Sequence, residues 1–141
     1  MGRDKATIVA GGASLAERSA AALRAVAAPV LASCPTASTG CAVVDDPRQG
    51  PLVAFDAGSH ALAEHGHDGP VILLACDMPL VTGEMLARMT RMRNGADAVV
   101  PIDQGRLQPL CAVYAPRARV IAHGLVAAGA RSMRDLSLIH I

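Results

Sequence analysis

Apolar residues in this chain recur in two patterns, short continuous runs and longer stretches with helical spacing. The run at 71–76 is apolar at every position, which is typical of a strand buried on both faces of a parallel sheet. The helically spaced stretches are bounded by Pro, by Gly and by Thr82, a residue type that often begins a helix. The runs predict strands at 6–10, 30–33, 41–44, 71–76, 98–102 and 110–114, and the spaced stretches predict helices at 13–28, 52–64, 82–93 and 116–128.

This alternation of strands and helices predicts the α/β fold class. We expect three layers, with a mostly parallel sheet and helices on both of its faces, as in Rossmann-like folds. A length of 141 residues argues for one domain. We assign residues 1–136 to this domain and treat 137–141 as a short apolar tail.

Composition and charge limit which binding partners and which cellular location we expect for this chain. The net charge is +1 and no basic stripe is present, which argues against binding to nucleic acid. The longest apolar run is too short to cross a bilayer, and no secretory leader is recognisable. Four cysteines without a CxxC pair favour reduced thiols and a cytoplasmic location. Nothing in the pattern fixes the oligomeric state, and we favour a monomer.

Candidate chemistry lies where predicted strands end, because open α/β sheets bind ligands at the carboxyl ends of their strands. Asp45 and Asp46 follow the run at 41–44, and Asp77 follows the run at 71–76. A carboxylate in such a place suits Mg²⁺, which takes one or two carboxylates together with substrate phosphates. Asp77 could instead simply cap the helix that begins near Thr82. Lys5 could hold a phosphate or belong to an ordinary solvated terminus.

Five segments resemble, in order, the signature of the molybdenum cofactor guanylyltransferases, a family of MobA-like nucleotidyltransferases. No single segment is specific, but together they cover nearly the whole chain. They are MGRDKA at 1–6, GPL at 50–52 after the acidic pair, CDMP at 76–79, QPLCAVY at 108–114 and GARSMRDL at 129–136.

The resemblance implies an enzyme that transfers GMP from GTP to molybdopterin. A phosphate oxygen of molybdopterin attacks the α-phosphorus of GTP, and pyrophosphate leaves. Lys5 and Asp77 are then the implied catalytic residues. Lys5 would contact the nucleotide phosphates, and Asp77 would hold Mg²⁺, which neutralises charge on the reacting oxygens.

The same resemblance assigns roles to four further residues. Asp46 would hydrogen-bond guanine or its ribose, and Ser33 falls where many members have an Asn that contacts the nucleotide. Arg131 and Ser132 are implied on the molybdopterin side. Asp46 favours guanine, since a carboxylate accepts from guanine N1 and N2.

The sequence also departs from the family pattern. The family's first strand and Gly-rich phosphate loop would precede Met1, and its closing strand and helix would follow residue 136. AGGAS at 10–14 copies that loop only superficially. The resemblance thus implies a chain truncated at both ends, with an exposed strand edge, marginal stability and little activity. Micromolar binding of GTP in Mg²⁺ would contradict that expectation. The alternatives are a cytidylyltransferase of the same superfamily and a non-catalytic fragment without the phosphate loop.

Two further groups of side chains receive simpler interpretations. His60, His65 and His67 suggest a metal cluster, but a solvated loop is the preferred reading. Met85, Met89 and Met92 recur at helical spacing, which predicts a stripe that faces the core.

Overall fold

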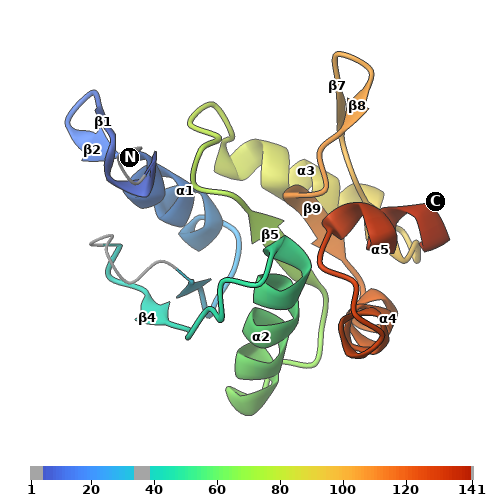
Figure 1. Cartoon of the computed structure of the whole chain (residues 1–141). Coiled ribbons are helices and arrows are strands. Elements are labelled where there is room, and N and C mark those ends of the chain that lie inside the picture. Colours follow the sequence, from blue (N-terminus) through green and yellow to red (C-terminus); the bar gives the residue numbers. More distant parts are fainter. Residues whose placement is uncertain (1–4, 34–38, 141) are drawn as a thin grey trace.

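The computed structural model describes residues 5–33 and 39–140 (Figure 1). The first four residues of the MGRDKA segment, most of the loop before Gly40, and Ile141 lie outside this part. The described elements are η1 Lys5–Thr7, β1 Val9–Ala10, β2 Ala13–Ser14, α1 Leu15–Arg24, β3 Leu31–Ala32, β4 Ala42–Val43, α2 Pro51–Glu64 and β5 Val71–Leu74. They continue with α3 Gly83–Met92, β6 Ala98–Val99, β7 Ile102–Asp103, β8 Arg106–Leu107, β9 Cys111–Tyr114, α4 Pro116–Ala127 and α5 Met133–His140.

The expected α/β layering is confirmed around β9. This strand is the middle of a three-stranded sheet in the order β5–β9–β6, and all four of its residues are buried. Because side chains alternate along a strand, β9 contributes to two cores. Cys111 and Val113 pack with α1 and α3, and Ala112 and Tyr114 pack with α2, α4 and α5. Figure 1 shows α1 and α3 above the strands and α2 and α4 below them.

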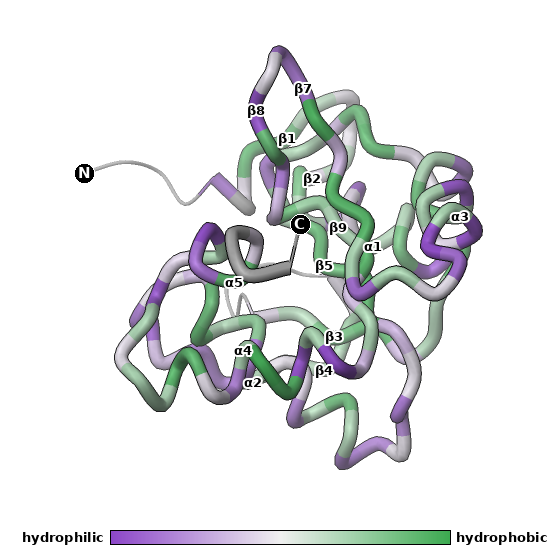
Figure 2. Tube along the Cα trace, turned by 90° about the vertical axis from the view of Figure 1, so that its right-hand side faces the viewer, coloured by the Kyte–Doolittle hydropathy of each residue, from purple (hydrophilic) through white to green (hydrophobic). Residues whose placement is uncertain are grey.

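The expectation of a mostly parallel sheet is wrong for these three strands. β9 runs antiparallel to both β5 and β6, and in the described part only β3 and β4 pair in parallel. Strands that run in the same direction need a crossover, usually a helix, and α3 supplies one between β5 and β6, which lie on either side of β9. Between β6 and β9 the chain instead forms the β7–β8 hairpin, which reverses its direction. The tip of this hairpin is hydrophilic and projects away from the other elements (Figure 2).

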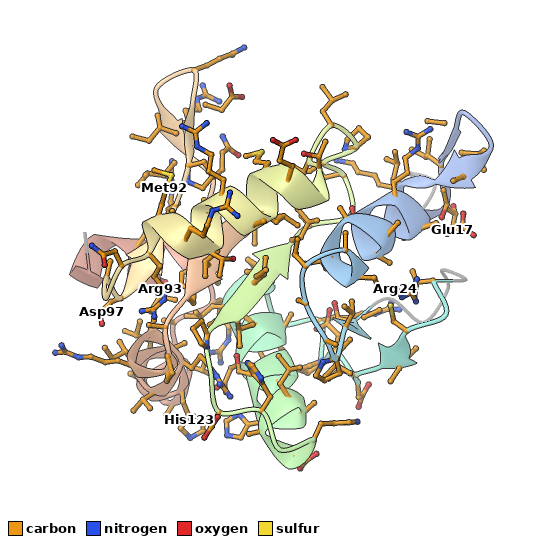
Figure 3. All side chains as sticks on the ribbon, turned by 180° about the vertical axis from the view of Figure 1, so that it is seen from behind. Glu17, Arg24, Met92, Arg93, Asp97 and His123 are labelled. Atoms are coloured by element: carbon orange, nitrogen blue, oxygen red, sulfur yellow. The ribbon has the colours of Figure 1, made fainter. Side chains whose placement is uncertain are left out.

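Two predictions of burial also need correction. β5 was expected to be buried on both faces, but only Val71 is buried and the next three residues are half-buried, because β5 lies at the edge of its sheet. The prediction that three methionines face the core is wrong for two of them. Met89 is buried, whereas Met85 and Met92 are exposed, since α3 turns Leu86 and Met89 toward β9. Figure 3 shows Met92 at the periphery, where α3 ends.

The predicted helices are all present, with shifted ends. α1 begins at Leu15 because Ser14 and Glu17 form a capping box, and α2 begins with Pro51 in its first turn. Residues 137–140 of the predicted tail continue α5, and Ser137 is buried there with its hydroxyl donating to the Met133 carbonyl at 3.1 Å. Among the described residues, no helix has the length and apolar character required to cross a membrane.

Candidate functional site

The parallel pair β3–β4 brings Ser33 and Asp46 to one end of a sheet. The two strands are in register from Leu31 opposite Ala42, and the Val44 N–H donates to the Ala32 carbonyl at 2.8 Å. Ser33 is exposed and Asp46 is half-buried. The Oδ1 atom of Asp46 accepts from the Arg48 N–H at 2.8 Å, which fixes the turn that follows. Asp46 therefore combines a turn-forming role with a second oxygen, Oδ2, that this bond does not use.

Asp77 is an exposed carboxylate directly beyond β5. It does not cap α3, because Thr82 does so: its side chain accepts from the Met85 N–H at 3.2 Å. The capping alternative for Asp77 is thus excluded, while the predicted N-cap at Thr82 is confirmed. To the residues that the structure describes, the Asp77 carboxylate makes no hydrogen bond or ion pair. It is available to a cation.

Lys5 lies in η1, which packs on α1, and its side chain is exposed. Its carbonyl accepts from the Ile8 N–H at 3.2 Å. The same helix α1 also packs on β5, where the Ser19 hydroxyl donates to the Ala75 carbonyl at 3.3 Å. Lys5 and the strand that leads to Asp77 therefore have α1 as a common neighbour.

Arg131 joins two segments of the predicted signature. Its carbonyl accepts from the Leu52 N–H at 3.1 Å. Gly50 has φ +111°, and a Cβ there would lie 2.7 Å from the same carbonyl oxygen. Only glycine fits this approach without strain. The GPL turn and the GARSMRDL segment are thus in direct contact.

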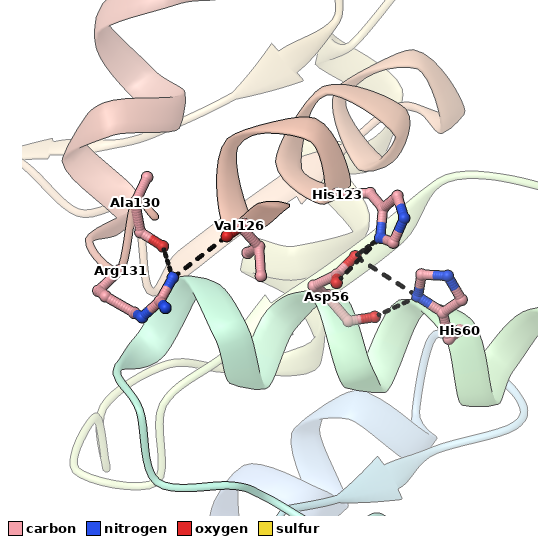
Figure 4. Close-up of polar contacts among 6 residues, drawn as sticks. All are labelled: Asp56, His60, His123, Val126, Ala130 and Arg131. Carbon is pink, nitrogen blue, oxygen red and sulfur yellow. Dashed lines mark hydrogen bonds and ion pairs between the residues drawn. The ribbon is translucent and has the colours of Figure 1, made fainter. Parts of the chain in front are cut away.

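The side chains of Arg131 and Ser132 already have local partners. Arg131 Nη1 donates to the carbonyls of Val126 at 3.2 Å and Ala130 at 2.8 Å (Figure 4). Ser132 Oγ accepts from the Arg134 N–H at 3.2 Å at the start of α5. Both side chains are exposed, so both can still reach a ligand.

A cavity of about 590 Å³ lies between α1, β3, α2 and β5. It is lined mostly by apolar side chains and by every residue from 71 to 76. Of the predicted site residues only Ser33 borders it. The cavity lies along β5, so the sheet edge and the cavity together leave three residues of this strand half-buried.

Burial raises the pKa values of two side chains of β9, the middle strand of the sheet. Desolvation raises the pKa of the Cys111 thiol, so this group stays protonated. Burial likewise raises the pKa of Tyr114, whose hydroxyl donates to the Pro109 carbonyl at 2.7 Å. Neither group acts as a nucleophile or a base at neutral pH.

Sequence reasoning missed one cluster of metal-ligating side chains. His60 does not gather with His65 and His67; it lies with Asp56 on α2 and with His123 on α4 (Figure 4). The signal within α2 was the Asp56–His60 spacing of four, which places both side chains on one face. Nothing local pointed to His123, because the packing of α2 on α4 supplies it.

Comparison with protein families places this arrangement among known proteins. The model of the MobA-like NTP transferase domain matches residues 1–139. A probable molybdenum cofactor guanylyltransferase of Mycobacterium avium is 34% identical, over 96% of this chain and 73% of that protein. One from Bacillus licheniformis is 41% identical over 53% of this chain, and one from Clostridium perfringens is 34% identical over 48%. These two matches span 37% and 32%, about a third, of the relatives' own lengths.

Solved structures agree in fold. The molybdopterin-guanine dinucleotide biosynthesis protein A of Archaeoglobus fulgidus superposes with a TM-score of 0.68 at 20% identity, over 96% of this chain and 71% of that one. A 2-C-methyl-D-erythritol 4-phosphate cytidylyltransferase of Thermus thermophilus gives 0.66 at 22% identity, over 97% and 80%. At such identities the likeness concerns the fold alone.

Proposed function

The chain belongs to the family of MobA-like NTP transferase domains, and from this premise we propose that it carries out transfer of GMP from GTP to molybdopterin. The bond formed joins a molybdopterin phosphate oxygen to the α-phosphorus of GTP. The bond broken is the one from that phosphorus to the β-phosphate, and pyrophosphate departs with the electron pair.

The observation that carries the proposal is the carboxylate of Asp77. It is exposed at the carboxyl end of β5, has no partner among the described residues and has no duty at the helix that follows. One such oxygen donor suits Mg²⁺, whose other positions are commonly filled by phosphates and water. A Mg²⁺ ion bound there would neutralise phosphate charge during the transfer.

Three side chains would hold the nucleotide. Lys5, exposed on η1, would place a point charge against the phosphates. Ser33 follows β3 and Asp46 follows β4, at the carboxyl ends of a parallel strand pair, which is where such folds bind ligands. Asp46 would accept from guanine or its ribose through the oxygen that the Arg48 N–H does not use.

Arg131 and Ser132 would face molybdopterin. The contact of the Arg131 backbone with Gly50 fixes the position of this segment beside the start of α2. One nitrogen of the Arg131 guanidinium donates to the carbonyls of Val126, in α4, and Ala130, just after it, which leaves the others for a phosphate.

The test uses the longest reading frame that contains this chain, and it follows GTP-dependent dinucleotide formation and pyrophosphate release in Mg²⁺. Asp77→Asn should lower kcat by about 100-fold or more, because charge stabilisation at the reacting phosphates is lost. Lys5→Met should raise the KM for GTP by about 10-fold, the usual cost of one charge-assisted hydrogen bond.

Asp68→Asn is the matched control, since Asp68 is an exposed carboxylate in the loop after α2. It should leave both constants unchanged. If Asp77→Asn were as active as this control, the role of Asp77 and with it the proposed mechanism would have to be given up.

Base choice is tested separately from chemistry. Thermal-shift titrations with GTP and with CTP should show the larger stabilisation with GTP, and Asp46→Asn should reduce that preference. A larger shift with CTP would favour the cytidylyltransferase alternative while leaving the role of Asp77 intact.

A further inference from the structure

We infer that Asp56, His60 and His123 form a binding site for a divalent transition-metal cation, apart from the proposed nucleotide site. The cluster joins one helical turn of α2 to the facing surface of α4, on the side of the sheet away from α1 and α3 (Figures 1 and 4). None of its residues belongs to the segments of the predicted signature.

The two imidazoles direct the same kind of nitrogen at one carboxylate. His123 Nδ1 lies 3.2 Å from Asp56 Oδ2 and 3.3 Å from Oδ1. His60 Nδ1 lies 3.4 Å from Asp56 Oδ1 and 3.0 Å from the Asp56 main-chain carbonyl oxygen, which is its hydrogen-bond partner. The two rings are 4.8 Å apart between centroids and tilted by 56°. One potential ligand atom from each side chain lies within 4.8 Å of the others.

These separations are close to those around a bound ion. Two ligands at about 2.0–2.1 Å from a tetrahedral Zn²⁺ lie about 3.3 Å from one another. Both nitrogen–carboxylate distances already have about this value. Binding of an ion requires His60 Nδ1 to leave the Asp56 carbonyl and the two imidazoles, whose ligand nitrogens lie within 4.8 Å of each other, to approach. They can do so by side-chain rotation, because the His60 and His123 side chains are 59% and 61% exposed.

Asp56 is the fixed member of the cluster. Its side chain is only 13% exposed, and it is held on the packed face between α2 and α4. Arg119, one turn before His123, does not compete for it. The Arg119 guanidinium instead donates to the carbonyls of Gly69 at 3.0 Å and Ser59 at 2.9 Å.

The donor set selects the class of metal. Two imidazole nitrogens and one carboxylate suit Zn²⁺, Co²⁺, Ni²⁺ or Cu²⁺, whereas Mg²⁺ prefers an all-oxygen shell. Three protein ligands leave at least one coordination position open. The adjoining hollow of about 580 Å³, which His67 and Asp68 also border, gives water or a small anion access to it.

The test is a titration of the untagged 141-residue chain with Zn²⁺ against a chromophoric chelator, together with Co²⁺ absorption spectra. We expect one ion per chain with micromolar affinity, and Co²⁺ bands of nitrogen and oxygen ligation without a sulfur charge-transfer band. At about 100-fold excess over the dissociation constant, Zn²⁺ should raise the Tm by about 5–10 °C. Millimolar Mg²⁺ should not displace it.

Single substitutions test whether the bound Zn²⁺ is held by these three side chains. His60→Gln, His123→Gln and Asp56→Asn should each weaken Zn²⁺ binding by at least about 10-fold. His65→Gln is the matched control, because His65 is an exposed histidine at the end of the same helix, and its affinity should equal that of the parent. Three results would overturn the inference. They are no binding at millimolar Zn²⁺, a loss of Zn²⁺ affinity in His65→Gln equal to that in the ligand variants, and a Co²⁺ thiolate band that persists in the His60→Gln/His123→Gln double variant.

Discussion

The two parts of this molecule differ in how firmly they are packed. In residues 51–137, helices α2, α4 and α5 enclose a core in which Leu52, Tyr114 and Leu136 are at most 1% exposed. In residues 5–44 the strands form two separate two-residue ladders, and both residues of β4 are exposed. The buried hydrophobic residues there are three alanines of α1, among the residues described.

This difference matters because the proposed nucleotide contacts lie mostly in the weaker part. Lys5 and Ser33 lie within residues 5–44 and Asp46 lies just after them, whereas Arg131 is tied to the start of α2. Elements with few buried apolar contacts open at lower free energy than the core. We therefore expect the guanine side of the site to be mobile and the molybdopterin side to be firm. Four changes test that contrast.

The largest effect on stability should come from Leu52→Ala in residues 51–137, the firmly packed part. Leu52 is 0% exposed beneath α4 and α5, so its removal should lower the free energy of unfolding by about 2–5 kcal/mol. Leu31→Ala is the counterpart in the weak part, where the side chain is half-buried beside the cavity. It should cost about 1 kcal/mol or less. Urea unfolding measures both, and equal costs would break the comparison.

Gly50→Ala should be the next most severe. The substitution forces a side chain onto a backbone with φ +111° and against the Arg131 carbonyl, at a cost of about 1–3 kcal/mol. Gly124→Ala, in the middle of α4 with open space around it, should instead stabilise by about 0.5–1 kcal/mol. Opposite signs in thermal unfolding would support the close contact, and a harmless Gly50→Ala would contradict it.

Ser14→Ala tests the weak part alone. Ser14 accepts from the Glu17 N–H at 3.1 Å, so its loss should destabilise α1 by about 1 kcal/mol. If the two parts open separately, hydrogen exchange should speed up for α1 amides and stay unchanged for β9. Equal acceleration in both would show that they unfold as one unit.

The smallest effect concerns pH. The Ser14 N–H donates to Glu17 at 2.6 Å, and this bond to the carboxylate lowers the pKa of Glu17 below its usual range. Its contribution to stability is therefore present above the unfolded pKa of about 4.3 and is lost as the pH falls through the folded value. The stability difference between the parent and Glu17→Gln, measured by urea unfolding, should shrink on acidification. A difference that does not vary with pH would rule out the capping box as its source.

Local signals in the sequence predicted the helices well. Thr82 caps the start of α3, and Gly129, with φ +98°, follows the end of α4 as expected of a glycine that terminates a helix. These features depend on neighbouring residues alone. The same is true of the motif segments, whose order was sufficient to identify the family.

Features that depend on distant residues were not predictable in this way. The direction of β9 follows from two features. The β7–β8 hairpin reverses the chain before β9, and β9 then pairs with β5, where Val71 lies opposite Tyr114. The half-buried state of β5 follows from its place at a sheet edge, although its sequence is wholly apolar. His123 joins Asp56 only because α4 packs on α2. The assigned roles of Lys5, Ser33, Asp46 and Asp77 remain predictions.

Tyr114 has a practical consequence for optical studies that rely on the aromatic side chains of this protein. The chain has one tyrosine and no tryptophan, and this tyrosine sits in β9 with its ring centroid 4.9 Å from that of Phe55. Near-ultraviolet circular dichroism and intrinsic fluorescence therefore report on the core around β9 alone. Residues 5–44 could detach and re-form with little change in either signal, so a single sharp transition in these two signals would not establish that the whole chain unfolds at once.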